Sequence, residues 1–180
     1  DQEPVTWEQA LEFAARRLPG SDGLSVVLNG SLTNEEAYLL LKLARDAWGA
    51  QMVCFAEGRK GPEVTFKSGF RIGEDRTPNR RGVHEIAQAL GIELDSERGL
   101  LARIDDRTIT RAYVVGSDAL VESMTTGSST LDELELLVVQ STIPSSLTQS
   151  AHLVIPGLTA FEKEGTFTNF DGRVQRIRRC

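Results

Sequence analysis

Three runs of small and polar residues are the strongest candidates for ligand binding, because each directly follows a predicted buried strand. They are Asn29-Gly30-Ser31, Gly116-Ser117-Asp118 and Gln140-Ser141-Thr142. In doubly wound α/β sheets, ligands bind at the carboxyl ends of the strands, where small residues allow close approach. A helix expected to begin near Thr33 would add unpaired N–H groups suited to phosphate. The same residues also suit ordinary turns and caps, so both interpretations stay open.

The sequence contains no standard catalytic or nucleotide-binding signature. It lacks G-x-G-x-x-G, G-x-x-x-x-G-K-[ST], H-E-x-x-H and G-x-S-x-G, so no catalytic residue is predicted. Two cysteines are too few for a four-thiolate iron–sulfur cluster or zinc site, and no metal site is expected. Cys54 lies in an apolar strand and should be inert, whereas Cys180 should be exposed. His84 is expected on a helix surface beside Glu85, and His152 as a satisfied packing or edge residue.

Length, charge and hydropathy exclude several classes of protein. The chain has 180 residues, which suits one domain, and carries 20 Lys and Arg against 26 Asp and Glu, a net charge of −6. This acidic balance argues against nucleic acid as a partner. The sequence contains no run of about 18 apolar residues, the length that a membrane-spanning helix needs, so direct insertion into a membrane is not expected. The low cysteine content favours a reducing, cytoplasmic location, and a chain beginning with Asp1 suggests a piece of a longer protein.

Helical and strand patterns alternate along most of the chain, which predicts a parallel α/β sheet. Capping boxes are expected at Thr6/Gln9, Thr33/Glu36 and Thr130/Glu133. The helix over 34–48 is rich in Leu and Ala almost all round and should be largely covered. Strands are expected over 24–28, 51–55, 111–115, 136–139 and 152–155, and further helices over 6–18, 83–90, 97–104, 131–134 and 145–150.

Two segments depart from this alternation. Residues 56–82 are rich in Gly and Arg and are expected to form a long loop inserted into an α/β domain that spans 1–160. Residues 161–180 contain Asp171-Gly172 between β-forming residues, a strong hairpin signal. A basic tail follows, formed by Arg173, Arg176, Arg178 and Arg179, and its removal leaves a charge of −6 − 4 = −10. This segment is interpreted as the start of a following domain.

Several strings resemble the molybdopterin oxidoreductases. The segment Ala151–Pro156, with Glu162, Gly165-Thr166, Asn169 and Gly172–Gln175, is similar to that family's A-D-x-V-L-P…E…G-T…N…G-R-x-Q. Pro78-Asn79-Arg80-Arg81-Gly82 resembles its P-N-x-x-G loop, and 113–118 resembles its strand ending in G-x-[DN]-P. Leu32–Tyr38 resembles L-T-N-E-E-x-Y of the large iron–sulfur subunit of bacterial NADH:quinone oxidoreductase (complex I). The resemblance covers nearly all of the chain.

The resemblance implies a Rossmann-like, doubly wound, mainly parallel five-stranded sheet with a C-terminal β-hairpin, inside a longer polypeptide that carries iron–sulfur clusters elsewhere. It also adds Asn79 to the candidate cofactor-binding residues. One interpretation is a scaffold domain of complex I without a redox centre of its own. The alternative is a fragment of a molybdopterin guanine dinucleotide enzyme such as formate dehydrogenase, in which Asp118 would accept from guanine or ribose and N–H groups near Ser31 would contact phosphate.

Departures from the family pattern favour the complex I interpretation. Ala119 replaces the Pro of G-x-[DN]-P, His152 replaces the Asp of A-D, and no Cys or Ser stands where a metal ligand would. The expected partners are then the other subunits of a respiratory complex and the remaining domains of the same polypeptide. The expected location is the cytoplasmic side of the inner membrane, peripheral and held there through those subunits.

Overall fold

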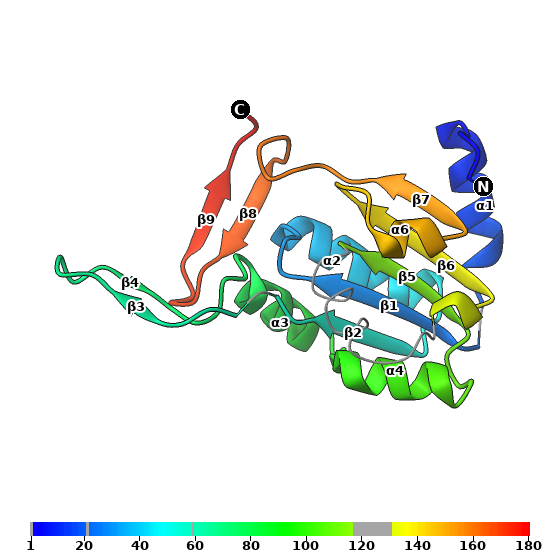
Figure 1. Ribbon diagram of the computed structural model, residues 1–180, viewed down its shortest axis with the longest axis horizontal. Helices are drawn as coiled ribbons and strands as arrows, with labels where there is room; N and C mark the ends of the chain where they lie inside the picture. The colour runs from blue at the N-terminus through cyan, green and yellow to red at the C-terminus, as the bar shows by residue number, and fades with distance from the viewer. Residues whose placement is uncertain (1, 21, 59, 117–130) are drawn as a thin grey trace.

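A five-stranded parallel sheet forms the centre of the molecule in the computed structural model, which describes residues 2–20, 22–58, 60–116 and 131–180 (Figure 1). The strands lie in the order β2-β1-β5-β6-β7, and every neighbouring pair is parallel. This confirms the predicted fold class. The strands are β1 (Leu24–Asn29), β2 (Met52–Ala56), β5 (Arg111–Val115), β6 (Leu136–Ser141) and β7 (Leu153–Pro156).

Helices cover both faces of the sheet, which is why its strands are apolar almost throughout. On one face, α1 (Trp7–Arg17), α2 (Asn34–Lys42) and α3 (Arg80–Ala89) pack on a core that includes Leu28 and Val138. On the other face, α4 (Glu97–Asp105) and α6 (Ser146–Ser150) pack on a core that includes Val27 and Leu137. Successive residues of one strand thus enter opposite cores, as the period-2 geometry of a strand requires.

Side-chain caps begin the first two helices where the sequence predicts them. Thr6 with Gln9, and Thr33 with Glu36, each form a reciprocal capping box that satisfies two helix N–H groups. Thr130, the cap expected before 131–134, lies outside the described residues, and only a 3-10 turn (Leu131–Glu133) follows it.

The expectation that 34–48 is largely covered is wrong. The helix continues from α2 into one turn of π-helix (Leu43–Ala47), and along it Tyr38, Leu39 and Leu43 are 44%, 61% and 44% exposed. Ala37, Leu40, Leu41 and Ala44 alone form the buried stripe. One face packs on the sheet and the opposite face meets solvent, so apolar residues all round do not by themselves indicate burial.

Two antiparallel hairpins project from the sheet (Figure 1). The stretch expected to be mostly loop contains β3 (Val64–Thr65) paired with β4 (Arg71–Ile72). The predicted C-terminal hairpin is confirmed as β8 (Gly165–Thr168) paired with β9 (Val174–Ile177). Among the described helices, none has both the length and the apolar character that crossing a membrane requires.

Candidate functional site

The reversal of strand order between β1 and β5 fixes where a ligand site would lie. The chain passes from β1 to its neighbour β2 and then crosses to β5 on the other side of β1. Connections that diverge in this way leave a crevice at the carboxyl ends of the two strands. Asn29 ends β1 and Gly116 follows β5, so two of the predicted site residues lie side by side at this crevice.

Asn29 shapes the crevice with its side chain. Its Nδ2 donates to the carbonyl of Val115 at 3.1 Å, and its Oδ1 accepts from the backbone N and the Oγ of Ser31 at 2.9 and 2.6 Å. Gly116 has φ +71°, and a Cβ there would lie 2.0 Å from the Asn29 Nδ2. The position therefore needs glycine twice, once for its backbone conformation and once for its contact with the Asn29 amide. The neighbouring Gly30 is buried.

The third predicted run closes the same edge. The carbonyl of Gln140 accepts from the N–H of Gly116 at 2.8 Å, and the Oε1 of Gln140 accepts from the hydroxyl of Tyr113 at 2.9 Å. The hydroxyl of Ser141 donates to the carbonyl of Ile143 at 2.9 Å. The structure thus brings the residues of three strand ends together. Ser117 and Asp118, with Ala119, lie outside the described residues.

Asn79 is fully buried, and its side chain joins three segments of the chain. Its Nδ2 donates to the carbonyl of Leu32 at 2.8 Å and to Oδ1 of Asn34 at 3.0 Å. Its Oδ1 accepts from the N–H of Thr168 at 2.7 Å. A Cβ on Gly82 would come within 2.3 Å of this amide oxygen, so the Asn and the Gly of the P-N-x-x-G string pack directly together. The geometry gives Asn79 a structural role.

Polar contacts that the sequence did not single out attach the C-terminal hairpin to the start of α2. Thr166 donates from its backbone N and its hydroxyl to the carboxylate of Glu35, at 2.8 and 2.9 Å. Burial acts to raise the pKa of Glu35, but the hydrogen bonds from Thr166 outweigh it, and the pKa lies below its ordinary value. Lys163, 9% exposed, donates to Glu36 at 2.8 Å and to the carbonyl of Ser31 at 3.3 Å. In the sequence, the Gly165-Thr166 string of the family pattern pointed to these residues.

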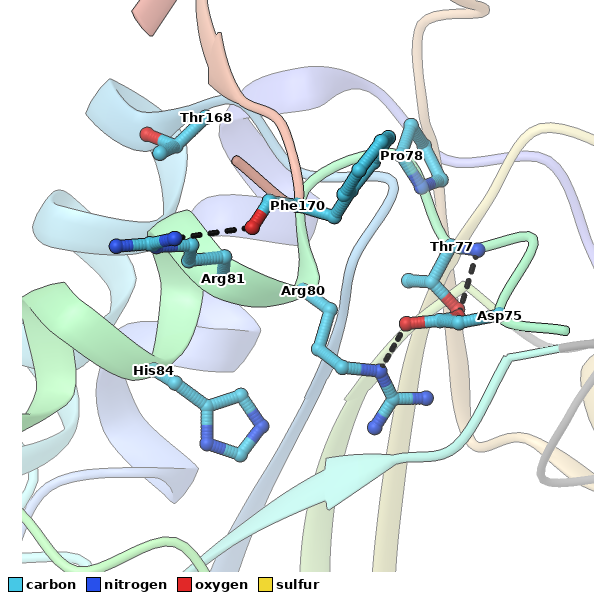
Figure 2. A pocket seen from close by; sticks show the side chains of 8 residues that line it. All are labelled: Asp75, Thr77, Pro78, Arg80, Arg81, His84, Thr168 and Phe170. Carbon is cyan, nitrogen blue, oxygen red and sulfur yellow. Dashed lines mark hydrogen bonds and ion pairs between the residues drawn. The ribbon is translucent and has the colours of Figure 1, made fainter. Parts of the chain in front are cut away.

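A cavity of about 350 Å³ lies next to these contacts. Figure 2 shows its lining, drawn from the base of the β3–β4 hairpin, from α3 and from the C-terminal hairpin: Asp75, Thr77, Pro78, Arg80, Arg81, His84, Thr168 and Phe170. Both cations are paired: Arg80 donates to Asp75 at 2.5 Å, and Arg81 donates to Glu85 at 2.7 Å and to the carbonyl of Phe170 at 2.9 Å. The cavity combines a proline and an aromatic ring with neutralised charges, which suits a planar polar ligand better than a free anion.

His84 is exposed on α3, as expected for a residue of the helix surface, and it also lines this cavity. Its ring lies 4.8 Å from that of Phe55, because α3 packs His84 toward the end of β2. Burial, and next the charge of Arg80, lower the pKa of His84 below its ordinary value, which keeps the imidazole neutral at physiological pH.

The predictions for the two cysteines and for His152 are confirmed. Cys54 is buried and Cys180 exposed. Burial raises the pKa of the Cys54 thiol to about 12, so it holds its proton. The Nδ1 of His152 accepts from the N–H of Leu137 at 3.0 Å, as expected for a satisfied edge residue.

The chemistry open to this edge of the sheet is that of binding and orienting a ligand. No group of three His, Cys, Asp or Glu side chains capable of holding a metal occurs within the described part of the chain. The groups that do gather there are amides, hydroxyls and backbone N–H and carbonyl groups, which form hydrogen bonds without adding charge.

Fold and site together define a doubly wound α/β domain of the kind that binds ligands at the carboxyl edge of its sheet. The family model described as molybdopterin oxidoreductase matches residues 82–180, and the chain belongs to this family. The family implies a molybdopterin cofactor in the parent enzymes.

The curated relatives are much longer than this chain. It is 38% identical over 116 residues to "Putative formate dehydrogenase YrhE" of Bacillus subtilis, covering 61% of this chain and 12% of the relative. It is 38% identical over 81 residues to the NADPH-Fe(3+) oxidoreductase subunit alpha of Geobacter sulfurreducens, covering 43% and 10%. It is 35% identical over 70 residues to the F420-dependent formate dehydrogenase 1 subunit alpha of Methanococcus maripaludis, covering 38% and 10%. The chain thus spans about a tenth of each relative's length.

Proposed function

We propose that this domain forms part of the cofactor-binding site of a formate dehydrogenase-type molybdopterin enzyme, built from several subunits. This is the alternative interpretation of the sequence, and the names of the relatives support it over a complex I scaffold. Two of the relatives are named as alpha subunits, which supports the multi-subunit assembly.

The contact between Gly116 and Asn29 is the observation that carries the proposal. At the switch point of the sheet, Gly116 lets the Asn29 amide lie directly against its backbone, where the Cβ of any other residue would displace that amide. The described donors at this edge are neutral, because the ammonium group of Lys163, beside the carbonyl of Ser31, is paired with Glu36. Amides and a hydroxyl suit the sugar and phosphate of a nucleotide-bearing cofactor.

In this proposal, Asn29, Ser31, Gly116 and Gln140 contact the nucleotide arm of a molybdopterin guanine dinucleotide. The cavity lined by Pro78, His84 and Phe170 accommodates a planar part of the same cofactor or of its substrate. When bound, the cofactor supplies the redox chemistry, while the residues of this chain bind and orient it. Neutral His84 acts there as a hydrogen-bonding group that adds no charge to the cavity.

The test is to measure molybdenum and guanine nucleotide in the purified parent enzyme, with and without Gly116→Ala. The variant should lose most of both, because the new Cβ displaces the Asn29 amide. Gly49→Ala is the matched control: Gly49 also has a positive φ of +62°, but nothing lies within 4 Å of a Cβ there. Full cofactor content in Gly116→Ala contradicts the site, and a parent enzyme without molybdenum or guanine nucleotide favours the scaffold interpretation instead.

A further inference from the structure

Three residues, Thr77-Pro78-Asn79, connect the β3–β4 arm to the start of α3. The arm is formed by residues 60–76 and extends away from the sheet (Figure 1). The side chain of Thr77 lines the cavity described above, between Asp75 and Pro78 (Figure 2). The same connection also packs on the turn Asn29-Gly30-Ser31, which belongs to the proposed nucleotide site. The connection therefore contacts both parts of the proposed binding site.

The turn after β1 contacts the connection through Gly30, which is buried. The N–H of Asn79 donates to the carbonyl of Gly30 at 2.9 Å. A Cβ on Gly30 would lie 2.0 Å from Cγ2 of Thr77 and 3.0 Å from the backbone N of Arg80, whereas ordinary carbon contacts are about 3.5–4.0 Å. The backbone of Gly30 has no positive φ that would require glycine. The methyl group of Thr77 is therefore the closest group that excludes a side chain at position 30.

The second branch of the Thr77 side chain contacts a second glycine. A Cβ on Gly58 would lie 2.0 Å from Oγ1 of Thr77. Gly58 follows β2 as Gly30 follows β1, and these two strands are parallel neighbours, so both glycines lie at the carboxyl edge of the sheet. A β-branched side chain has few χ1 rotamers, and contacts on both of its branches hold Thr77 in one of them.

Charged groups attach the connection to the end of β2. Asp75 accepts from the backbone N of Thr77 at 2.9 Å and from Arg80 at 2.5 Å. Arg80 also donates to both carboxylate oxygens of Glu57 at 2.7 Å, and Glu57 directly follows β2. Charge-assisted hydrogen bonds of this kind are stronger than neutral ones. Thr77 thus lies on a segment that is fixed to β2, while its methyl group contacts the turn after β1.

We propose that Thr77 is a positioning residue that fixes the turn Asn29-Gly30-Ser31 relative to the cavity, so that a single nucleotide-bearing ligand contacts both. A shift of Thr77 moves the wall of the cavity, and through the methyl group it moves Gly30 as well. Thr77 takes no part in the redox chemistry. The inference rests on the cofactor site proposed above, in which Ser31 contacts the nucleotide arm and the cavity accommodates a planar part of the same ligand.

The test moves one methyl group across this contact in the purified parent enzyme. Gly30→Ala adds a methyl group that Cγ2 of Thr77 excludes, so the contact must open by about an ångström or more. The guanine nucleotide retained after purification should then fall at least about tenfold. Thr77→Ser removes Cγ2 and leaves a gap of one methyl group, for which we expect about fivefold lower retention. The double variant Gly30→Ala/Thr77→Ser exchanges the two methyl groups and should restore retention to nearly that of the unmodified enzyme.

Two results would overturn the proposal: a double variant that retains no more nucleotide than Gly30→Ala, or full retention in Gly30→Ala alone. Where Gly30→Ala by itself does not fold, recovery of folded enzyme with its nucleotide in the double variant is the expected result, and no recovery overturns the proposal. Gly73→Ala is the matched control, because Gly73 also has no positive φ and nothing lies within 4 Å of a Cβ there. This control should retain its full nucleotide content.

A further comparison separates positioning from general stabilisation. Thr77→Ser should not restore nucleotide to Gly116→Ala, because a Cβ at position 116 meets the Asn29 amide instead of Thr77. Restoration of nucleotide in that combination would show that Thr77→Ser acts on the whole domain, and it would overturn the positioning role.

Hydrogen exchange at the Asn79 amide reports the contact independently of any cofactor, because this N–H donates to the carbonyl of Gly30. Exchange should accelerate in Gly30→Ala and slow again in the double variant, and unchanged exchange in Gly30→Ala would refute the contact. A parent enzyme that contains no guanine nucleotide refutes the cofactor proposal. Normal nucleotide content in the unmodified enzyme, with no rescue in the double variant, refutes the role of Thr77 alone.

Discussion

Replacing Asn79 by Ala should destabilise the domain by about 4 kcal/mol. Two of the hydrogen bonds of the Asn79 side chain are buried, the one to the carbonyl of Leu32 and the one from the N–H of Thr168. A buried polar group left without a partner costs about 1–3 kcal/mol, so two such groups cost about 2–6 kcal/mol. The loss of the contact with Asn34 adds little, because the Asn34 Oδ1 also accepts from the hydroxyl of Thr168 at 3.4 Å. The predicted loss is a large fraction of the ~5–15 kcal/mol that stabilises a typical domain.

Urea unfolding measures this loss directly. With a denaturant slope of about 2 kcal/mol per molar, the midpoint of Asn79→Ala should fall by about 2 M. Hydrogen exchange at the Thr168 amide should accelerate, because its acceptor is removed. Asn169→Ala is the matched control: its side chain accepts from two backbone N–H groups in an exposed turn, and its loss should cost about 1 kcal/mol. Equal losses of unfolding free energy in the two variants, or slow amide exchange at Thr168 in Asn79→Ala, would refute the structural role of the buried Asn79 side chain.

Three further predictions concern titratable groups. Hydrogen bonds from Arg80 hold the pKa of Glu57 below its ordinary 4.5. The stabilisation from this ion pair is therefore complete above about pH 4.5 and is lost as the pH falls through the lower pKa of the folded state. Arg80→Gln should flatten the decline in the free energy of unfolding between pH 5 and 3, and an unchanged decline would show that the Arg80–Glu57 pair adds no stability. Because the pKa of His84 is lowered, its NMR titration should lie below pH 6.5, and protonation there should favour the unfolded state. A midpoint above 6.5 would contradict the partial desolvation of the imidazole and the effect of Arg80 on it. At pH 8 a thiol reagent should modify Cys180 alone in the native protein and Cys54 as well in urea, and rapid modification of both before unfolding would contradict the buried thiol.

Local signals account for the parts of the fold that the sequence predicts well. Capping boxes at Thr6 and Thr33, apolar runs that become parallel strands, and Asp-Gly in the last hairpin each specify short-range geometry. The β3–β4 arm could not be read in this way, because its paired strands are two residues long and lie among glycines and charges. The strand order β2-β1-β5-β6-β7 depends on packing between distant segments, and hydrophobic periodicity reports only local structure.

In the candidate site too, local patterns predict some residues, and others depend on contacts between distant segments. Asn29, Gly116 and Gln140 could be placed at one edge because the carboxyl ends of parallel strands must meet there. The contribution of Lys163 could not be predicted, because its partner Glu36 lies 127 positions away in the sequence. Nor could the cavity beside His84, because it exists only where the arm, α3 and the last hairpin come together.

Asn79→Ala and Gly116→Ala are expected to differ in their loss of stability, and this difference distinguishes a residue that supports the structure of the site from one that lines it. Asn79→Ala should reduce both cofactor content and stability, since the C-terminal hairpin and the loop before α2 both form hydrogen bonds with its amide. Gly116→Ala should reduce cofactor content while its stability loss exceeds that of Gly49→Ala only by the cost of displacing the partly buried Asn29 amide, and stays below that of Asn79→Ala. If both variants lose cofactor in proportion to stability, the loss reports unfolding, and the switch-point contact is not the binding site.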